Sequence, residues 1–287
     1  MKNHCAYNHC YPYFVFVGLI IIGCAGTSIK TEVHTGRAAL VTNRTEQALW
    51  HFSAAAKLDP TFVAEYGPLQ QSIWTYVGKA YYKAENMVEA RRALDKAINT
   101  FPQDRMAKLY LALVKLHSDP QEDTRSGLTL AETVYLLKRG VSSQRVATLV
   151  TQRGVQFPWT SRAESQLASA GANESLLNQL RNTQRGRISP VPPRQMQSAN
   201  TQDLEMIFRD VLQWLNQIAG VPGPGQYWDA TGDIRRGIGQ SLETISNNQA
   251  TRETLIADGE WLGKRLEEEI DQAERQHRSE YRALESR

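Results

Sequence analysis

The segment that decides the fold is residues 71–104, which read QSIWTYVGKAYYKAENMVEARRALDKAINTFPQD. Apolar side chains recur in it every three or four positions, and that period predicts two amphipathic helices. The small residues Gly78 and Ala90 let the two helices approach closely, and Pro102 ends the second one. Three large side chains fill the space between the helices: Trp74, Tyr81 and Leu94. The segment therefore predicts a closely packed helical hairpin.

This hairpin resembles one tetratricopeptide repeat (TPR). The residues that occupy the signature positions are Trp74, Val77, Gly78, Tyr81, Ala90, Leu94, Ala97 and Pro102. In that family, hairpins stack into a curved solenoid because a single repeat cannot bury its apolar face alone. A generic helical hairpin is the alternative interpretation.

Two neighbouring segments follow the same pattern. Residues 29–62 carry small and apolar residues in the same register: Gly36, Ala48, Phe52, Ala55 and Pro60. Residues 63–70 are an extra spacer, in which Gly67-Pro68 marks a break. A third first helix is expected over 105–117, with its partner helix over 126–138. The TPR-like region is therefore assigned to residues 24–126.

The resemblance implies a binding groove, because the first helices of TPR proteins line a concave surface that holds a partner peptide or domain. Carried onto the best repeat, the groove positions are Ser72, Thr75, Lys79, Tyr82 and Lys83. Two lysines beside a tyrosine suit an acidic or aromatic peptide. For any one of these residues, a solvated helix face is the simpler alternative.

The N-terminus carries an export signal. Residues 14–22 form an apolar run that matches the core of a signal peptide and is too short to span a bilayer. The following Ile21-Ile22-Gly23-Cys24 resembles a bacterial lipobox. That resemblance implies a signal peptide over 1–23 and lipid on Cys24, and Ala25 favours an outer-membrane anchor facing the periplasm. An uncleaved N-terminal membrane anchor is the alternative.

The remaining chain divides into three segments that differ in composition. Over 127–182, glycines at helix ends alternate with Ser, Thr and Asn at helix starts, which predicts a small module of short helices. It resembles a module appended to multidomain bacterial sensor, protease and repeat proteins. Residues 183–202 are rich in Pro, Arg and Gln and are interpreted as a linker. Residues 203–287 form a C-terminal helical region, with helices expected near 203–218, 231–246 and 250–285.

The last of these helices carries a continuous apolar stripe and exposed ion pairs such as Asp271 with Arg275. The strings Gly225-Gln-Tyr-Trp-Asp229, Gly259-Glu-Trp-Leu-Gly-Lys and Glu267-Glu-Glu-Ile-Asp271 resemble a group of bacterial repeat lipoproteins of undefined function. In that group this region follows the repeats directly, so 127–202 is interpreted as an insertion.

Composition sets limits on function. The net charge of +3 from 33 basic and 30 acidic residues gives no electrostatic basis for nucleic-acid binding. Cys24 is the one cysteine outside the signal peptide, so no disulfide framework or thiolate metal site is expected. No catalytic or phosphate-loop motif is present, and neither a cofactor nor a catalytic residue is predicted. Carboxylates at Asp229, Asp233 and Glu260 leave an envelope hydrolase as a minor alternative.

The sequence therefore predicts an all-α protein: a TPR-like solenoid with a small helical insert and a C-terminal helical region. The expected function is that of a lipid-anchored envelope adaptor that binds a protein partner, without enzymatic activity. A structural assembly factor of an outer-membrane or secretion complex is the main alternative. A monomer is slightly favoured over a self-associating form.

Overall fold

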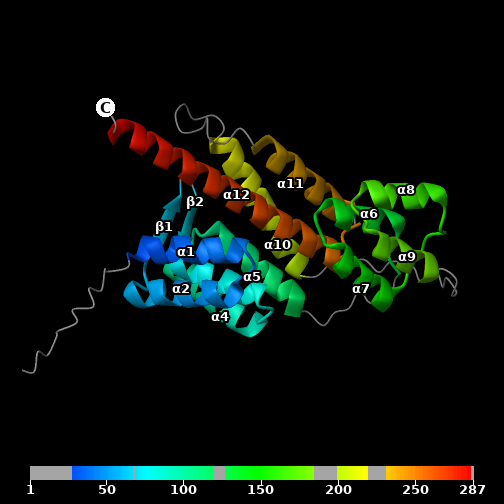
Figure 1. The fold of residues 1–287 in the computed structure, drawn as a ribbon, viewed down its shortest axis with the longest axis horizontal. Helices are drawn as coiled ribbons and strands as arrows, with labels where there is room; N and C mark the ends of the chain where they lie inside the picture. Colours follow the sequence, from blue (N-terminus) through cyan, green and yellow to red (C-terminus); the bar gives the residue numbers. More distant parts are fainter. Residues whose placement is uncertain are drawn as a thin grey trace, which may run out of the picture.

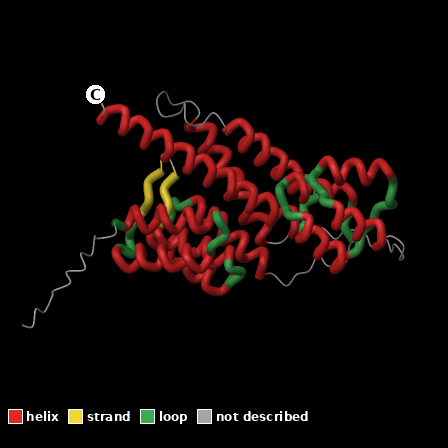
Figure 2. Tube along the Cα trace, viewed as in Figure 1, coloured by secondary structure: helices red, strands yellow, loops and turns green. Residues whose placement is uncertain are grey.

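A computed structural model describes residues 28–66, 69–118, 127–183, 199–218, 231–247 and 249–285. In this part of the chain it contains twelve helices and one two-stranded sheet, so the all-α class is confirmed (Figures 1 and 2). None of the helices described is both long and apolar enough to cross a bilayer. The predicted signal peptide and Cys24 lie outside the described residues.

Five consecutive helices form the first half of the molecule: α1 (Ile29–Val41), α2 (Thr45–Leu58), α3 (Ile73–Lys83), α4 (Met87–Thr100) and α5 (Arg105–Ser118). Each packs against the next along the chain. A Cβ on Gly36 would lie 2.4 Å from the Phe52 ring, and one on Gly78 would lie 2.6 Å from Leu94. The prediction that small residues bring paired helices together is therefore confirmed at Gly78, and Gly36 repeats it.

A β-hairpin stands where the sequence analysis placed a plain spacer. Strand β1 (Val63–Tyr66) pairs antiparallel with β2 (Leu69–Ser72), with Val63 opposite Ser72 and Tyr66 opposite Leu69. The hairpin is buried on one side, since Ala64 and Leu69 are each 2% exposed. The predicted break at Gly67-Pro68 lies outside the described residues, and the pairing of its two flanks was missed because the strands are only four residues long.

The second half of the molecule begins with the small module. Its helices are α6 (Leu130–Lys138), α7 (Ser143–Arg153), α8 (Ser161–Ser169) and α9 (Glu174–Thr183). Gly140, Gly154 and Gly171 take positive φ angles after their helices, as predicted for C-terminal caps. Side chains cap the predicted starts as well: Ser142, Thr160 and Asn173.

One helix packs against other helices than the one predicted. The segment 126–138 was expected to pair with α5 as the second helix of a third repeat. Instead, α6 packs against α7, α8 and α12, and its residues Leu136 and Leu137 are buried in the module's core. The apolar face of α6 is completed by the short helices that follow it, so it joins them rather than α5.

Three longer helices complete the fold: α10 (Ala199–Ile218), α11 (Thr231–Ser246) and α12 (Arg252–Glu285). Helices α10 and α12 both pack on α5, and α11 packs on both of them. Helix α10 begins inside the predicted linker, because residues 199–202 are already helical. Helix α12 starts beside α6 and runs across α5 to the β-hairpin, while α7, α8 and α9 lie beyond its start (Figure 1).

Helix α12 contributes side chains to two hydrophobic cores, through Ala257 to that of the small module and through later residues to that of α5 and α10. Its Leu262, Leu266 and Ile270 are at most 1% exposed and share a hydrophobic cluster with Leu113 of α5 and Phe208 of α10. This confirms the predicted apolar stripe over these three residues, whereas its later side chains are not described. The expected ion pair of Asp271 with Arg275 is replaced by an ion pair of Asp271 with Arg37 on α1.

Candidate protein-interaction site

The five predicted groove residues lie at or near the start of α3 and along one face of it, but they do not form an open surface. Ser72 and Thr75 are fully buried, Lys79 is 3% exposed and Tyr82 is 6% exposed. Only Lys83 is exposed to solvent. The structure brings four of the five together under other parts of the same chain.

Ser72 and Thr75 bind a buried carboxylate that the sequence analysis did not single out. The backbone N–H of Ser72 and the hydroxyl of Thr75 donate to Oδ2 of Asp104, at 2.7 and 2.5 Å. Oδ1 of Asp104 accepts from the backbone N–H of Ala107 at 2.8 Å, which caps the start of α5. Burial raises the pKa of Asp104, although these donors oppose the shift. Asp104 therefore ties α3 to α5; its place just before a helix is a signal that could have revealed it.

Lys79 lies between two aromatic rings and under an acidic helix. Its Nζ is 5.2 Å from the centroid of the Tyr76 ring and 5.7 Å from that of Tyr110, distances typical of cation–π contacts. The same ammonium forms an ion pair with Glu267 of α12, and the Tyr110 hydroxyl donates to that carboxylate at 3.3 Å. The lysine predicted to bind an acidic peptide therefore binds an acidic helix of its own chain.

Tyr82 continues these contacts one turn further along α3. Its hydroxyl donates to Oε1 of Glu260 at 2.8 Å and accepts from Nε2 of His117 at 2.9 Å. Burial and the Glu260 carboxylate both raise the pKa of Tyr82, which keeps the phenol protonated. Burial, with Arg252 nearby, lowers the pKa of His117 to about 4, so the imidazole is neutral at pH 7. The arrangement is a hydrogen-bond chain between α5, α3 and α12.

Two glycines allow α12 to approach this surface closely. A Cβ on Gly259 would lie 2.6 Å from Leu113, and one on Gly263 would lie 3.1 Å from the Tyr110 hydroxyl. Contacts as short as the first would force α12 away from α5. The acids Glu260, Glu267 and Asp271 follow on the same helix and meet the side chains of Tyr82, Lys79 and Arg37. The predicted groove surface is thus occupied by α12.

Replacement of Tyr82 by Phe should lower the free energy of unfolding by about 1–2 kcal/mol, because a buried hydroxyl with two partners is lost. Chemical unfolding followed by circular dichroism measures this change. Tyr81→Phe is the matched control, since the neighbouring Tyr81 is half-buried and takes no part in this hydrogen-bond chain. Equal effects of the two substitutions would show that the contact with Glu260 contributes nothing.

A second cluster of buried charges joins the small module to α12 and α11. The Arg139 side chain is 8% exposed, and its Nε lies 2.8 Å from Oδ1 of Asp258, which is 1% exposed. The same guanidinium donates to the carbonyl of Gly237 at 2.9 Å and to the Ser241 hydroxyl at 3.0 Å, and it stacks 4.5 Å from the Trp261 ring. We call these five residues the Arg139 joint.

A further buried arginine strengthens the same interface. Nη1 of Arg153 lies 3.1 Å from Glu132 and 2.9 Å from Glu253 of α12, with 2% of its side chain exposed. The Thr251 hydroxyl donates to the same Glu132 oxygen at 2.9 Å. Burial raises the pKa of Glu132, while Arg153 and Thr251 oppose this shift. The module is therefore held to α12 by two buried arginines.

The raised pKa of Asp258 predicts that the stability of the protein depends on pH. Burial raises its pKa from 3.8 to about 6, which means that the folded protein binds this proton more tightly than the unfolded chain. The resulting stabilisation is complete below pH 3.8 and is lost as the pH rises through 6. Between pH 7.5 and pH 5, wild type should gain about 1 kcal/mol relative to Asp258→Asn. Unfolding titrations of both proteins at the two pH values test this, and a constant difference would contradict it.

The carboxylates considered for hydrolysis have separate partners. Asp233 on α11 forms an ion pair with Arg236 of the same helix, and Glu260 on α12 accepts from Tyr82. Asp229, with the neighbouring Tyr227 and Trp228, lies outside the described residues. Among the residues that the structure describes, no group of three metal-ligating side chains is found.

No protein-family model matches the chain, and no curated protein is significantly similar to it. The proposed function therefore rests on the contacts described above.

Proposed function

We propose that this chain is a scaffold protein of the bacterial cell envelope, attached to the membrane by lipid on Cys24. Its TPR-like repeats form the body, and it binds protein partners rather than converting a substrate. One observation carries the proposal: α12 lies along the face of α3 where the TPR resemblance places a bound peptide. Side chains of α1 and α3 hold that helix through matched charges and hydrogen bonds, as repeat scaffolds hold their ligands.

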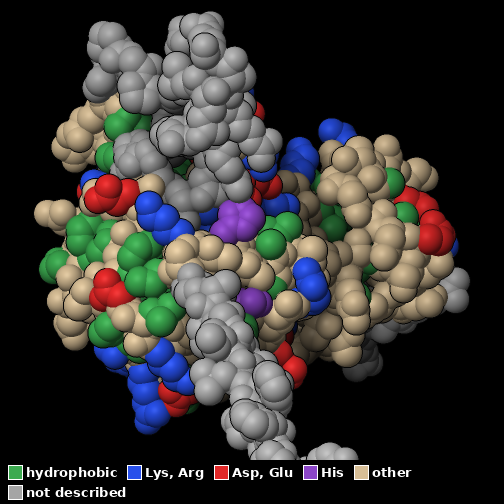
Figure 3. Space-filling model, turned by 60° about the vertical axis from the view of Figure 1, so that its left-hand side comes forward, with side chains coloured by type: hydrophobic (Ala, Val, Ile, Leu, Met, Phe, Trp, Pro, Cys, Tyr) green, Lys and Arg blue, Asp and Glu red, His purple; other side chains and the backbone are tan. Residues whose placement is uncertain are grey.

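The charges and the packing both support this interpretation. Lys79 and Arg37 pair with acids on α12, so the repeat surface selects a negatively charged helix. Gly259 and Gly263 allow that helix to pack closely against α5. The internal helix leaves the exposed Lys83 at the edge of the groove, where a partner reaches the repeats without displacing α12. Figure 3 shows acidic and basic side chains interspersed on one face, which suits specific docking better than non-specific attraction.

Two experiments test the lipid anchor and the scaffold function separately. Wild type and Cys24→Ala are expressed in a bacterial host, and membrane attachment and intact mass are measured. We expect wild type to carry the mass of a lipid and to stay in the membrane fraction, and the variant to do neither. An unchanged mass and an unchanged fraction would overturn the anchor.

The scaffold is tested with a photocrosslinking amino acid in place of Lys83, in the lipidated protein. The same amino acid in place of Lys57, an exposed lysine on α2, is the control. We expect defined envelope proteins to be crosslinked from position 83 and not from position 57. Identical crosslinking patterns from the two positions would overturn the scaffold proposal.

A further inference from the structure

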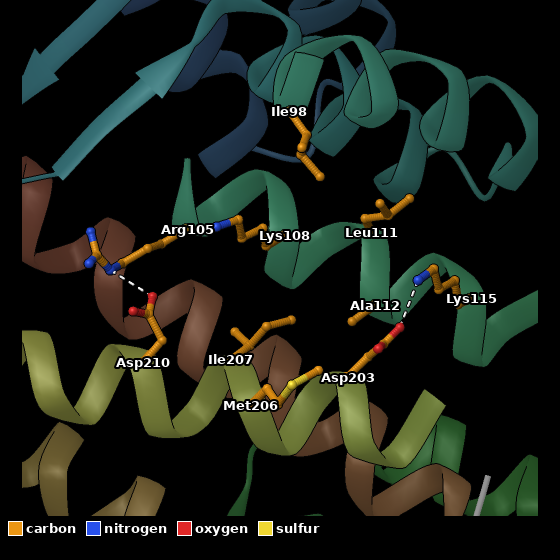
Figure 4. Close-up of a pocket in the computed structure, with 10 residues that line it drawn as sticks. All are labelled: Ile98, Arg105, Lys108, Leu111, Ala112, Lys115, Asp203, Met206, Ile207 and Asp210. Atoms are coloured by element: carbon orange, nitrogen blue, oxygen red, sulfur yellow. Dashed lines mark hydrogen bonds and ion pairs between the residues drawn. The ribbon is translucent and has the colours of Figure 1, made fainter. Parts of the chain in front are cut away.

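A hollow lies between α5 and α10, with Ile98 of α4 at its side (Figure 4). Its volume is about 340 Å³, which is within the range of small-molecule pockets. Asp203 and Asp210 mark its length on α10, and seven residues of helix correspond to about 10 Å. We call this hollow, which is lined along about 10 Å of α10, the trench, and it is separate from the surface that α12 occupies.

The middle of the trench is apolar. It is lined by Ile98, Leu111 and Ala112 on one side and by Met206 and Ile207 on the other, and the last two rise from α10 towards α5 (Figure 4). Met206 is 62% exposed, so an apolar side chain faces water at the edge of the trench. Methionine is flexible and adapts to ligands of different shape. The trench thus has an apolar surface that is exposed to water and that a chain-like ligand would cover.

The charges around the trench do not cancel. Arg105 pairs with Asp210 at 3.0 Å, and Lys115 pairs with Asp203 at 2.7 Å. These pairs neutralise both acids that line the trench. Lys108, between them on α5, makes no ion pair with any described residue. One uncompensated ammonium therefore stands beside the apolar floor.

We propose that this trench binds a single-chain amphiphile with a carboxylate head, namely a medium-chain fatty acid. The carboxylate pairs with Lys108, and the hydrocarbon tail lies along Leu111, Met206 and Ile207. A longer polyanionic ligand fits less well, because Lys108 is the one lining cation that is not already paired with an acid among the described residues. The site is independent of the scaffold function proposed above, since none of its lining residues touches α12 through a hydrogen bond or ion pair described for the chain.

The test uses octanoate and its neutral analogue octanol as probes, in calorimetric titrations of the folded protein. We expect octanoate to bind saturably with one site per chain. Lys108→Met should weaken octanoate binding about ten-fold and leave octanol binding unchanged, because only the charged head contacts the ammonium. Met206→Asp should abolish the binding of both probes, because it places a carboxylate on the apolar floor.

Lys57→Met is the matched control, since it also removes an exposed lysine but lies on α2, and it should leave both probes unaffected. Substitutions at exposed positions leave the fold intact, and thermal unfolding of each variant verifies this. Three results would overturn the proposal: no saturable binding of octanoate, equal binding by wild type and Lys108→Met, or binding that survives Met206→Asp.

Discussion

Replacement of Arg139 by Met should lower the free energy of unfolding by about 3–5 kcal/mol, the range for removing one partner of a buried ion pair. The cause is Asp258, whose carboxylate is 1% exposed and would lose its only cation among the described contacts. The loss also removes donors from the Gly237 carbonyl and the Ser241 hydroxyl. Chemical unfolding, followed by circular dichroism, measures the change.

Two further variants separate the buried charge from the loss of packing. Arg139→Met combined with Asp258→Asn should recover about 2 kcal/mol, because no unpaired charge remains. Arg236→Met is the control on a solvent-exposed pair, and it should change stability by no more than about 0.5 kcal/mol. If Arg139→Met stayed within that same limit, the Arg139 joint would not hold the module to α12.

Gly237→Ala should cost about 2–3 kcal/mol, although alanine is the better helix former. A Cβ at this position would lie 1.9 Å from Cη2 of Trp261 and 2.6 Å from two other atoms of its ring. The ring cannot withdraw without leaving Arg139, which stacks on it at 4.5 Å. The added methyl group therefore forces α11 away from α12.

The matched control lies two residues further along the same helix. A Cβ at Gly239 would meet nothing within 4 Å, so Gly239→Ala should stabilise the protein by about 0.5–1 kcal/mol. The opposite signs of the two substitutions distinguish close helix packing from helix propensity, and thermal unfolding curves report both. A stabilising Gly237→Ala would show that α11 and α12 are not in close contact here.

Local patterns in the sequence predicted the helices well because helix formation depends on neighbours along the chain. Residues 29–118 carry their apolar period and their small residues in each segment, so the predicted segments 29–62 and 71–104 each enclose two helices, and the helix predicted over 105–117 is α5. The β-hairpin was missed because four-residue strands have too few positions to show an alternating pattern. The sequence indicated a break at Gly67-Pro68, but it did not indicate that the segments on either side of it pair as strands.

The candidate site was harder to predict because its partners are remote in the sequence. The pattern placed Lys79 and Tyr82 on one face of a helix, but it could not show that Glu267 and Glu260 cover them. These contacts span up to 188 residues, as 267 minus 79 gives. The glycines at 259 and 263 were a usable signal for close helix packing, but they do not identify the surface that they face.

The ion pair of Arg37 with Asp271 joins residues 234 positions apart, and it has a consequence for how the protein is made. During synthesis, α1 and α3 leave the ribosome long before α12 has been made. Until then, the surface that carries Lys79 and Tyr82 faces solvent, with its apolar neighbours uncovered. Contacts between residues so far apart in the sequence slow folding and prolong the exposure of apolar surface. During synthesis this surface is therefore exposed to aggregation, whereas in the folded protein α12 covers it.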